Sequence, residues 1–219
     1  MSTRDAILNR LRKTVANGPP AALPAAAPRV AVTRVNDSSR PAMRARFAAE
    51  LERVRGQLHP AAGESEARDT LAAILRARAA TRITAWDDVP LTGWADTCTA
   101  LRVTRVGDDR AEAATADIGL TGCDAVIAAT GTLVLEGGPG RSRLASLLPA
   151  VHIVIARECQ LVPQLEDYLE RKRVDGNAAY RRSSAVTLIT GPSRTADIEM
   201  QIVYGAHGPL ELHVILIAE

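Results

Sequence analysis

The sequence predicts an α/β fold in which a mostly parallel sheet is flanked by helices. Short apolar runs of strand length alternate with helical segments along the 219 residues. Several of these runs are apolar at almost every position, which is typical of parallel strands buried on both faces. Apolar residues make up 47% of the chain and aromatic residues only 3%. A chain of this length buries a sizeable core, and here Ala, Val, Leu and Ile must build it.

The first segment is expected to be a helix that stands apart from the main core. The stretch Ser2 to Asp5 resembles a helix cap, and four apolar residues follow at helical spacing up to Val15. Residues 18–28, GPPAALPAAAP, read as a Pro/Ala linker. We therefore divide the chain into an N-terminal helix with its linker, residues 1–28, and an α/β domain, residues 29–219.

Within the α/β domain, β-branched and apolar runs predict strands, and apolar residues at a spacing of three and four predict helices. In the first half we expect strands at 30–35, 81–86 and 101–106, and helices at 41–57 and 64–80. In the second half we expect strands at 124–129, 132–136, 151–156, 185–190 and 210–218, and helices at 141–148 and 161–173.

Charge and cysteine usage exclude several classes of function. The net charge of +2, from 27 basic and 25 acidic residues, is too small to predict a nucleic-acid partner. No apolar run reaches the roughly 18 residues that a membrane span needs, and we expect a cytoplasmic protein. Three distant cysteines, Cys98, Cys123 and Cys159, cannot form a four-thiolate iron–sulfur site. With no metal-binding spacing present, we expect no cofactor in this chain.

The first motif that can carry chemistry is Thr130-Gly131-Thr132, which lies between two apolar runs. A glycine between two hydroxyl residues suits a tight turn where the backbone approaches a ligand. Backbone N–H groups and hydroxyls there can hold an anion. The alternative is an ordinary hairpin turn in which threonine serves β-structure.

The second motif is a glycine loop ahead of a predicted helix, with Gly138, Gly140, Arg141 and Ser142 as its candidate ligand-binding residues. A helix start presents free N–H donors, and an arginine adds a fork for a carboxylate or phosphate. The loop matches neither a Walker A sequence nor the G-x-G-x-x-G fingerprint, so it implies no nucleotide.

The third motif follows the strand predicted at 185–190 and contains Ser193, Thr195, Asp197 and Glu199. Such a loop, leading into a short helix start at the carboxyl end of a strand, offers hydrogen-bond donors where open α/β sheets bind ligands. The alternative is plain helix capping, with the acidic residues matching the helix dipole.

The fourth motif places His207 between glycines ahead of the last strand. It can act as a proton carrier or an anion donor near neutral pH, or it can simply be solvated. His152 and His213 lie inside strand patterns, and we interpret both as packed structural residues. His59 is expected in a loop beside Pro60.

Taken in order, these segments resemble the LUD-domain family, and within it the LutC/YkgG group of lactate-utilization C subunits. The resemblance rests on residues 116–122 and 129–135, on 138–142 with 147–152, and on 191–199 with 205–209. It implies a fold similar to the NagB/RpiA/CoA-transferase group, whose members include sugar-phosphate isomerases. It also implies a role in oxidising L-lactate to pyruvate together with iron–sulfur partner subunits. Family members often carry glutamate just before the T-G-T step, where this chain has Ala129.

We therefore expect glycine-turned loops to converge at one rim of a parallel sheet and to offer backbone hydrogens to a small anionic ligand. The residues expected to bind it are Thr130, Gly131, Thr132, Gly138, Gly140, Arg141, Ser142, Ser193, Thr195, Asp197, Glu199 and His207. One hypothesis is a lactate-utilization subunit. The alternative is a stand-alone binding protein or enzyme for a sugar phosphate or a CoA-like ligand. A third is a scaffold that only assembles partners. No catalytic residue is identified.

Overall fold

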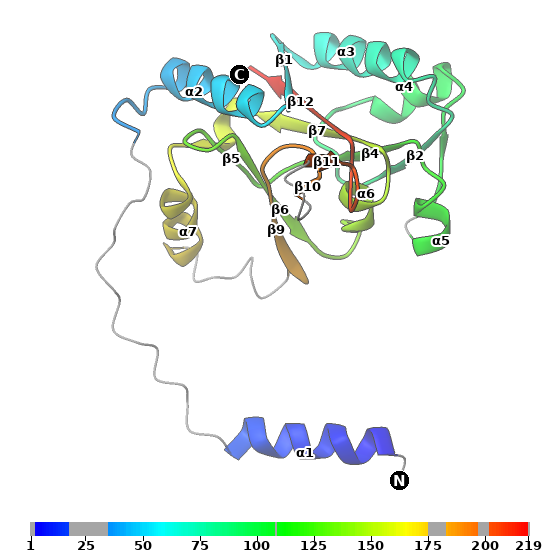
Figure 1. Cartoon of the computed structure of the whole chain (residues 1–219), viewed down its shortest axis with the longest axis vertical. Helices are drawn as coiled ribbons and strands as arrows, with labels where there is room; N and C mark the ends of the chain where they lie inside the picture. The colour runs from blue at the N-terminus through cyan, green and yellow to red at the C-terminus, as the bar shows by residue number, and fades with distance from the viewer. Residues whose placement is uncertain (1–2, 18–34, 108, 175–182, 197–201, 219) are drawn as a thin grey trace. The chain divides into compact units, whose positions relative to one another are not determined.

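The computed structural model of the chain describes residues 3–17, 35–107, 109–174, 183–196 and 202–218. The chain divides into two units, Met1–Val32 and Thr33–Glu219. The first unit carries helix α1 (Thr3–Asn17), as the spacing of its apolar residues predicted (Figure 1). All other helices and strands belong to the second unit.

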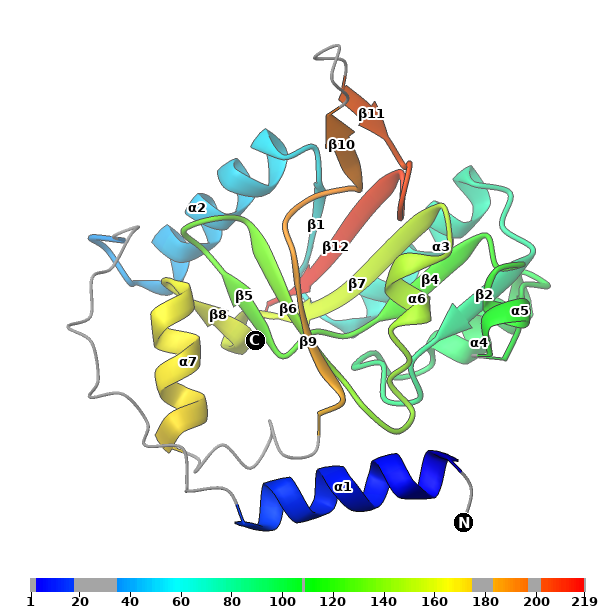
Figure 2. The ribbon, with the colours of Figure 1, turned by 60° about the horizontal axis from the view of Figure 1, so that its bottom comes forward.

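The second unit is built around a six-stranded sheet in which every neighbouring pair of strands is parallel (Figure 2). Its strand order is β1-β12-β7-β4-β2-β3. The strands are β1 (Gln57–Ala61), β2 (Arg82–Ala85), β3 (Thr104–Arg105), β4 (Ile118–Thr121), β7 (Val151–Arg157) and β12 (Glu211–Ile217).

A second sheet of four strands has the order β8-β5-β6-β9 and is mixed, because only the β5–β8 pair is parallel. Its strands are β5 (Ala125–Ile127), β6 (Thr132–Gly137), β8 (Leu161–Val162) and β9 (Ala185–Ile189). A separate antiparallel hairpin consists of β10 (Arg194–Ala196) and β11 (Ile202–Tyr204).

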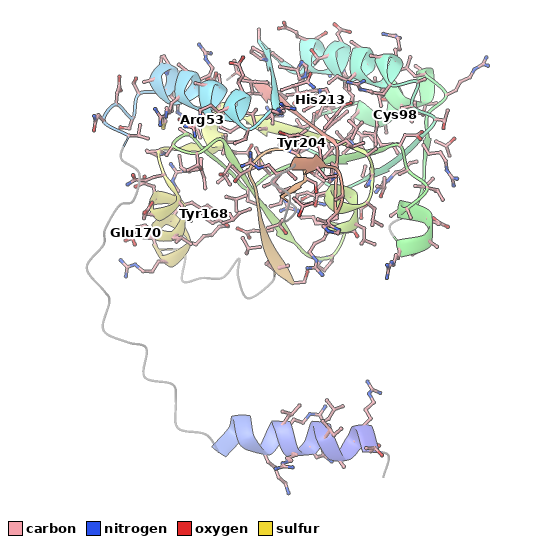
Figure 3. The ribbon with its side chains drawn as sticks, in the orientation of Figure 1. Arg53, Cys98, Tyr168, Glu170, Tyr204 and His213 are labelled. Carbon is pink, nitrogen blue, oxygen red and sulfur yellow. The ribbon has the colours of Figure 1, made fainter. Side chains whose placement is uncertain are left out.

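The helices complete the layers. They are α2 (Arg40–Arg53), α3 (Glu64–Ala77), α4 (Trp94–Ala100), α5 (Arg110–Ala113), α6 (Leu144–Leu147) and α7 (Leu165–Val174), with a 3₁₀ turn at Glu158–Gln160. Helix α3 packs on one face of the parallel sheet over β1 and β12. The four-stranded sheet and α6 lie over the other face, and α7 covers the outer side of the four-stranded sheet with Tyr168 (Figure 3).

The α/β fold with a parallel sheet is thus confirmed, and the second, mixed sheet is an addition to it. Several expectations need correction, and one falls mostly outside the described residues. Residues 57–61, expected at a helix end and in a loop, form β1. The strand expected at 101–106 covers only Thr104–Arg105, because α4 precedes it. The segment expected to start a helix near 193 is strand β10. Of the strand expected at 30–35, residues 30–34 lie outside the described residues, and residue 35 is not in a strand.

Candidate functional site

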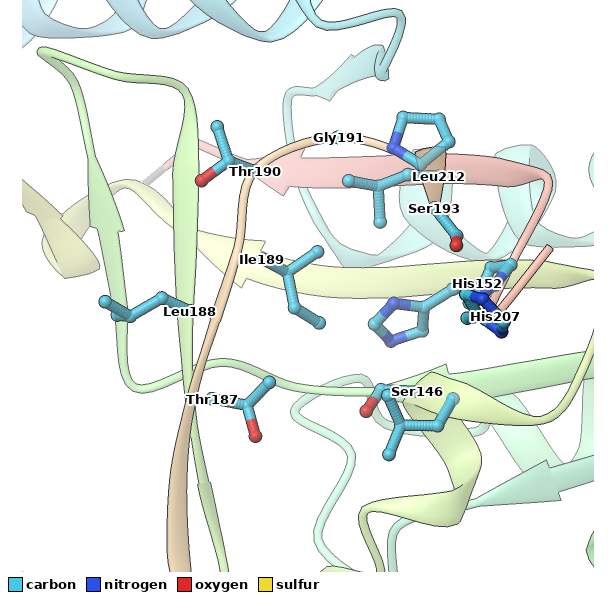
Figure 4. Close-up of a pocket in the computed structure, with 14 residues that line it drawn as sticks. Ser146, His152, Thr187, Leu188, Ile189, Thr190, Gly191, Ser193, His207 and Leu212 are labelled. Atoms are coloured by element: carbon cyan, nitrogen blue, oxygen red, sulfur yellow. The ribbon is translucent and has the colours of Figure 1, made fainter. Parts of the chain in front are cut away.

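The second unit contains a cavity of about 240 Å³ between β9 and the amino-terminal halves of β7 and β12 (Figure 4). Segment 187–193 bounds one side, His152 and Leu212 of the parallel sheet bound another, and α6 contributes Ser146 and Leu147. Among the residues described there, no carboxylate, guanidinium or ammonium group lines the cavity. Its polar groups are hydroxyls, imidazoles and backbone, so an anionic guest meets no like charge.

Strand alternation turns His152 toward this cavity. His152 is the second residue of β7 and is in register with Leu212 of β12 and Gly119 of β4. Register partners point to the same face of a sheet, so the three residues form one row across it. A Cβ on Gly119 would lie 1.7 Å from the carbonyl oxygen of Ala145. Glycine at this position therefore allows α6 to pack against the row and to close the cavity.

His152 is buried, and among the described residues only one side of its ring is hydrogen-bonded. Its Nε2 lies 2.9 Å from the hydroxyl oxygen of Thr121, which is also buried. Burial lowers the pKa of His152 to about 3, because the charged imidazolium would lose its hydration there. The ring is therefore neutral at physiological pH and acts in the cavity as a hydrogen-bonding group without charge.

The third and fourth sequence motifs meet at this cavity. Ser193 N–H donates to the carbonyl of Pro209 over 2.8 Å, and Gly205 N–H donates to the carbonyl of Ser193 over 2.8 Å. Ser193 and His207 both line the cavity. Thr195 lies beyond it in strand β10, where it is in register with Val203. Asp197 and Glu199 lie outside the described residues.

The first motif contacts the cavity through Thr190, a lining residue, and does not line the cavity itself. Thr130 and Thr132 bring their hydroxyl oxygens within 2.7 Å of each other, and Thr132 is again 2.7 Å from the hydroxyl of Thr190, which lines the cavity. Gly131 has φ +65°, and a Cβ on it would lie 2.6 Å from the backbone nitrogen of Leu51 in α2. The glycine therefore serves a tight β5–β6 turn packed against a helix.

The second motif lies at the opposite end of β6, and the expected convergence of all the glycine loops is wrong. Gly131 precedes β6 and Gly138 follows it, so the length of a six-residue strand separates them. Gly138 N–H and Arg141 N–H each donate to the other's carbonyl oxygen, and the carbonyl of Gly140 accepts from Asp87 N–H. The loop is a closed turn whose backbone donors at Gly138 and Arg141 are already used.

Arg141 is also fully engaged with acidic partners. Its Nε donates to Asp88 over 2.7 Å, and one terminal nitrogen lies 2.9 Å from Asp124. The next residue, Ser142, accepts from Trp86 Nε1 through its carbonyl and from Leu144 N–H through its hydroxyl. Two carboxylates already neutralise the arginine, so the loop offers little attraction to a free anion.

A second cavity of about 350 Å³ opens beside Arg141 and is lined by charges of both signs. Glu136 is buried, accepts a hydrogen bond of 2.5 Å from the Tyr168 hydroxyl, and is ion-paired with Lys172. Burial raises the pKa of Asp124, although the Glu136 amide and Arg141 stabilise its charged form. The structure thus separates a charged cavity from an uncharged one.

Among the lining residues that sequence reasoning missed, four have polar side chains: Ser146, His152, Thr187 and Thr190. His152 is packed and buried as interpreted, but it also faces the cavity. A single histidine within an apolar run gives no signal of which face it occupies. Only the register of β7 with β12 and β4 reveals that face, and register is a property of the folded sheet.

Among the described residues, no group of three or more His, Cys, Asp or Glu side chains is placed to hold a metal ion. Cys98 and Cys123 are buried and Cys159 is exposed. Burial raises the pKa of Cys98 to about 11. None of the described helices combines the length and apolar character needed to cross a membrane.

Comparison with known proteins places these features in a family. The family model described as the LUD domain matches residues 44–217. The chain is similar to lactate utilization protein C of Exiguobacterium sp., with 34% identity over 153 residues, which is 68% of this chain and 66% of that protein. It is also similar to lactate utilization protein C of Halalkalibacterium halodurans, with 38% identity over 104 residues, 48% of this chain and 45% of that protein. The matches therefore span about half to two thirds of these relatives' length.

The fold has a counterpart among solved structures. A crystal structure of a DUF162 family protein from Deinococcus radiodurans superposes with a TM-score of 0.63 and 26% sequence identity, over 83% of this chain and 99% of that chain. The family match covers both sheets, from α2 to the end of β12. The chain therefore belongs to the LUD domain family.

Proposed function

We propose that this chain is the C-type subunit of a lactate-utilization system, that it works in the cytoplasm with iron–sulfur partner subunits, and that its uncharged cavity binds a small 2-hydroxy or 2-oxo carboxylate. The observation that carries the assignment is the LUD-domain match over residues 44–217, joined to relatives named lactate utilization protein C. The size and lining of the cavity support the ligand class.

Oxidation of L-lactate to pyruvate releases two electrons and two protons. The sequence has three cysteines, of which the described structure buries two and exposes one, and these do not fit a four-thiolate cluster. In this proposal the electrons pass to redox groups of partner subunits. The contribution of this chain is to bind and orient a small acid.

The uncharged cavity suits such an acid. Its volume of about 240 Å³ lies below the roughly 300–1,000 Å³ typical of sites for drug-sized ligands, so a three-carbon acid fits better than a CoA-like molecule. Leu147, Leu188 and Leu212 offer apolar contacts for a methyl group. The hydroxyl of Ser193 and the exposed His207 supply polar groups for oxygen atoms.

Deletion of the gene tests the role in the system. We expect loss of growth on L-lactate as sole carbon source, with normal growth on pyruvate as the control. Purification of the tagged chain from its native cytosol should recover iron-containing partners. Normal growth on L-lactate would remove the assignment.

The second candidate function is a stand-alone binding protein or enzyme for a small anionic metabolite, and the cavity itself favours it. A thermal-shift screen with lactate, pyruvate, sugar phosphates and CoA separates the two candidates, since a bound ligand raises the melting temperature by mass action. A shift with a sugar phosphate and none with lactate or pyruvate would favour the second candidate.

A further inference from the structure

The ring of His152 has one nitrogen without a hydrogen-bond partner among the described residues. Its side chain is only 1% exposed, and its single hydrogen bond within the described segments joins Nε2 to Thr121. Among the described residues, two side-chain atoms are inaccessible and lack a hydrogen-bond partner: Thr84 Oγ1 and Gln164 Oε1. Nδ1 of His152 is not one of these inaccessible atoms. The open nitrogen therefore faces the cavity that His152 lines (Figure 4).

The hydroxyl of Thr121 determines which ring nitrogen carries the proton. Thr121 is fully buried, and His152 Nε2 is the one hydrogen-bond partner of its hydroxyl within the described chain. A buried hydroxyl proton needs an acceptor, and here only Nε2 can accept it. Nε2 must then hold a lone pair, which leaves the proton of the neutral ring on Nδ1. The opposite tautomer would bury the hydroxyl proton with no acceptor.

The surroundings keep this donor uncharged and fixed. Burial holds the pKa of His152 near 3, so the ring does not titrate in the physiological range. Besides His152, the titratable side chain that lines the cavity is His207, which is exposed. Thr121 fixes the ring orientation from the sheet side. The cavity therefore presents a fixed, neutral N–H donor and no charged side chain among its lining residues. Such a donor favours a ligand that carries an acceptor oxygen.

We propose that His152 is the specificity-determining residue of this cavity, and that its Nδ1–H donates to the oxygen on C2 of a 2-oxo or 2-hydroxy carboxylate. This inference rests on the ligand class given under Proposed function. It adds that the contact at C2 comes from a neutral imidazole whose tautomer is set by Thr121. An acid that lacks the C2 oxygen leaves this donor without an acceptor.

Two side-chain amides separate the two ring nitrogens in a test. In His152→Gln the amide oxygen reaches the position of Nε2 and accepts from the Thr121 hydroxyl, so that contact is kept and the donor into the cavity is lost. In His152→Asn the amide nitrogen takes the position of Nδ1, so the donor is kept. His59→Gln is the matched control, because His59 lies on the edge strand β1 and does not line the cavity.

The probes are pyruvate and propionate, which differ at C2, titrated by calorimetry into each variant. The wild type and His59→Gln should bind pyruvate at least about tenfold more tightly than propionate, the value of one buried hydrogen bond. His152→Gln should bind the two acids equally, and His152→Asn should keep part of the preference. An unchanged preference in His152→Gln would overturn the proposal.

Nitrogen NMR of the wild-type imidazoles tests the tautomer without any ligand. We expect the proton on Nδ1 of His152 and a neutral ring at pH 5, with a change at Nδ1 when pyruvate binds. A proton on Nε2 refutes the inference even if both acids bind. Failure of the wild type to bind pyruvate or lactate removes the proposed guest, whereas the growth phenotype on L-lactate decides the role in the system separately.

Discussion

The two faces of the parallel sheet each bury one histidine, and they treat it differently. His213, on the face covered by α3, has both ring nitrogens bonded: Nδ1 lies 3.0 Å from His59 Nε2, and Nε2 lies 3.1 Å from Glu211. His152, on the opposite face, has one nitrogen bonded and the other open to a cavity. A buried histidine with both ring nitrogens hydrogen-bonded stabilises the fold. A buried histidine with one ring nitrogen open to a cavity indicates a ligand-binding site.

The His213 side is a continuous polar chain. The rings of His59 and His213 are within 20° of parallel with centroids 5.3 Å apart, a separation that fits two rings joined tip to tip by one hydrogen bond. Glu211 extends the chain to Arg78, which lies 2.5 Å away at the end of α3. These polar contacts connect the edge strand β1, its neighbour β12 and the end of helix α3.

Truncation of the satisfied histidine should have the largest effect on stability. His213→Ala removes packed volume and the hydrogen bonds to His59 and Glu211, so we expect a loss of about 3 kcal/mol in the free energy of unfolding. His152→Gln, which keeps the contact with Thr121, should cost about 1 kcal/mol. Urea denaturation of the two variants measures the difference. Equal costs would break the contrast between the two faces.

Acid should destabilise both faces. Burial lowers the pKa of His59, with a further contribution from His213, and burial lowers the pKa of His213 against the opposing effect of Glu211. Their unfolded forms take up protons more readily, so the stability contribution is complete above pH 6.5 and is lost as the pH falls below it. His152 extends the loss toward pH 3, at up to about 1.4 kcal/mol per pH unit.

Denaturation at pH 7, 6, 5 and 4 measures this dependence. The double variant His59→Gln/His213→Gln should flatten the curve just below pH 6.5. His152→Gln should flatten it over the whole acidic range. Curves that superpose on the wild type would show that these rings are not the groups that take up the protons.

A smaller effect is expected at Thr121, and it should separate stability from binding. Thr121→Val keeps the shape of the side chain but removes the donor to Nε2 of His152, at a cost of about 1–2 kcal/mol in the free energy of unfolding. Because the tautomer is then no longer fixed, affinity for pyruvate should fall severalfold. Denaturation and calorimetry on one preparation give both values, and unchanged affinity would argue against the control of the tautomer by Thr121.

The smallest effect on ligand affinity is expected at Arg141. Its partners are Asp88 and Asp124, and it does not line the uncharged cavity. Arg141→Gln should therefore leave the affinity for pyruvate within about twofold of the wild type, with a stability cost of about 1 kcal/mol from the broken ion pairs. A large loss of affinity would place the guest in the charged cavity.

The sequence was informative where apolar runs alone decide the structure. The strands at 132–137, 151–157 and 185–189 and the helix at 64–77 match their patterns closely. Strand β1 was not predicted because its sequence, QLHPA, contains a proline and has leucine as its one large apolar residue. It is a strand because it lies at the sheet edge, beside β12, and not because of its own propensity.

The candidate site was harder to predict from the sequence than the strands, for a physical reason. Ser193 and His207 were identified from glycine-rich loops, and the structure brings both to one cavity. Gly138 and Arg141 have the same loop character but lie at the far end of β6, because that strand runs antiparallel to β5 and β9 in the second sheet. Which end of a strand a loop occupies depends on topology, and local sequence does not encode it.

The position of β12 has a consequence for biosynthesis. This strand separates β1 from β7, and among the described strands it is the only neighbour of β1 in the sheet. Roughly 150 residues must be synthesised after β1 before its partner emerges from the ribosome. Until then β1 lacks its partner β12, and β7 exposes one unpaired edge. Unpaired edges of this kind are prone to aggregation and are bound by chaperones. A premature stop ahead of residue 211 should therefore leave β1 separated from β7, and the nascent chain cannot complete the sheet before residues 211–217 are free.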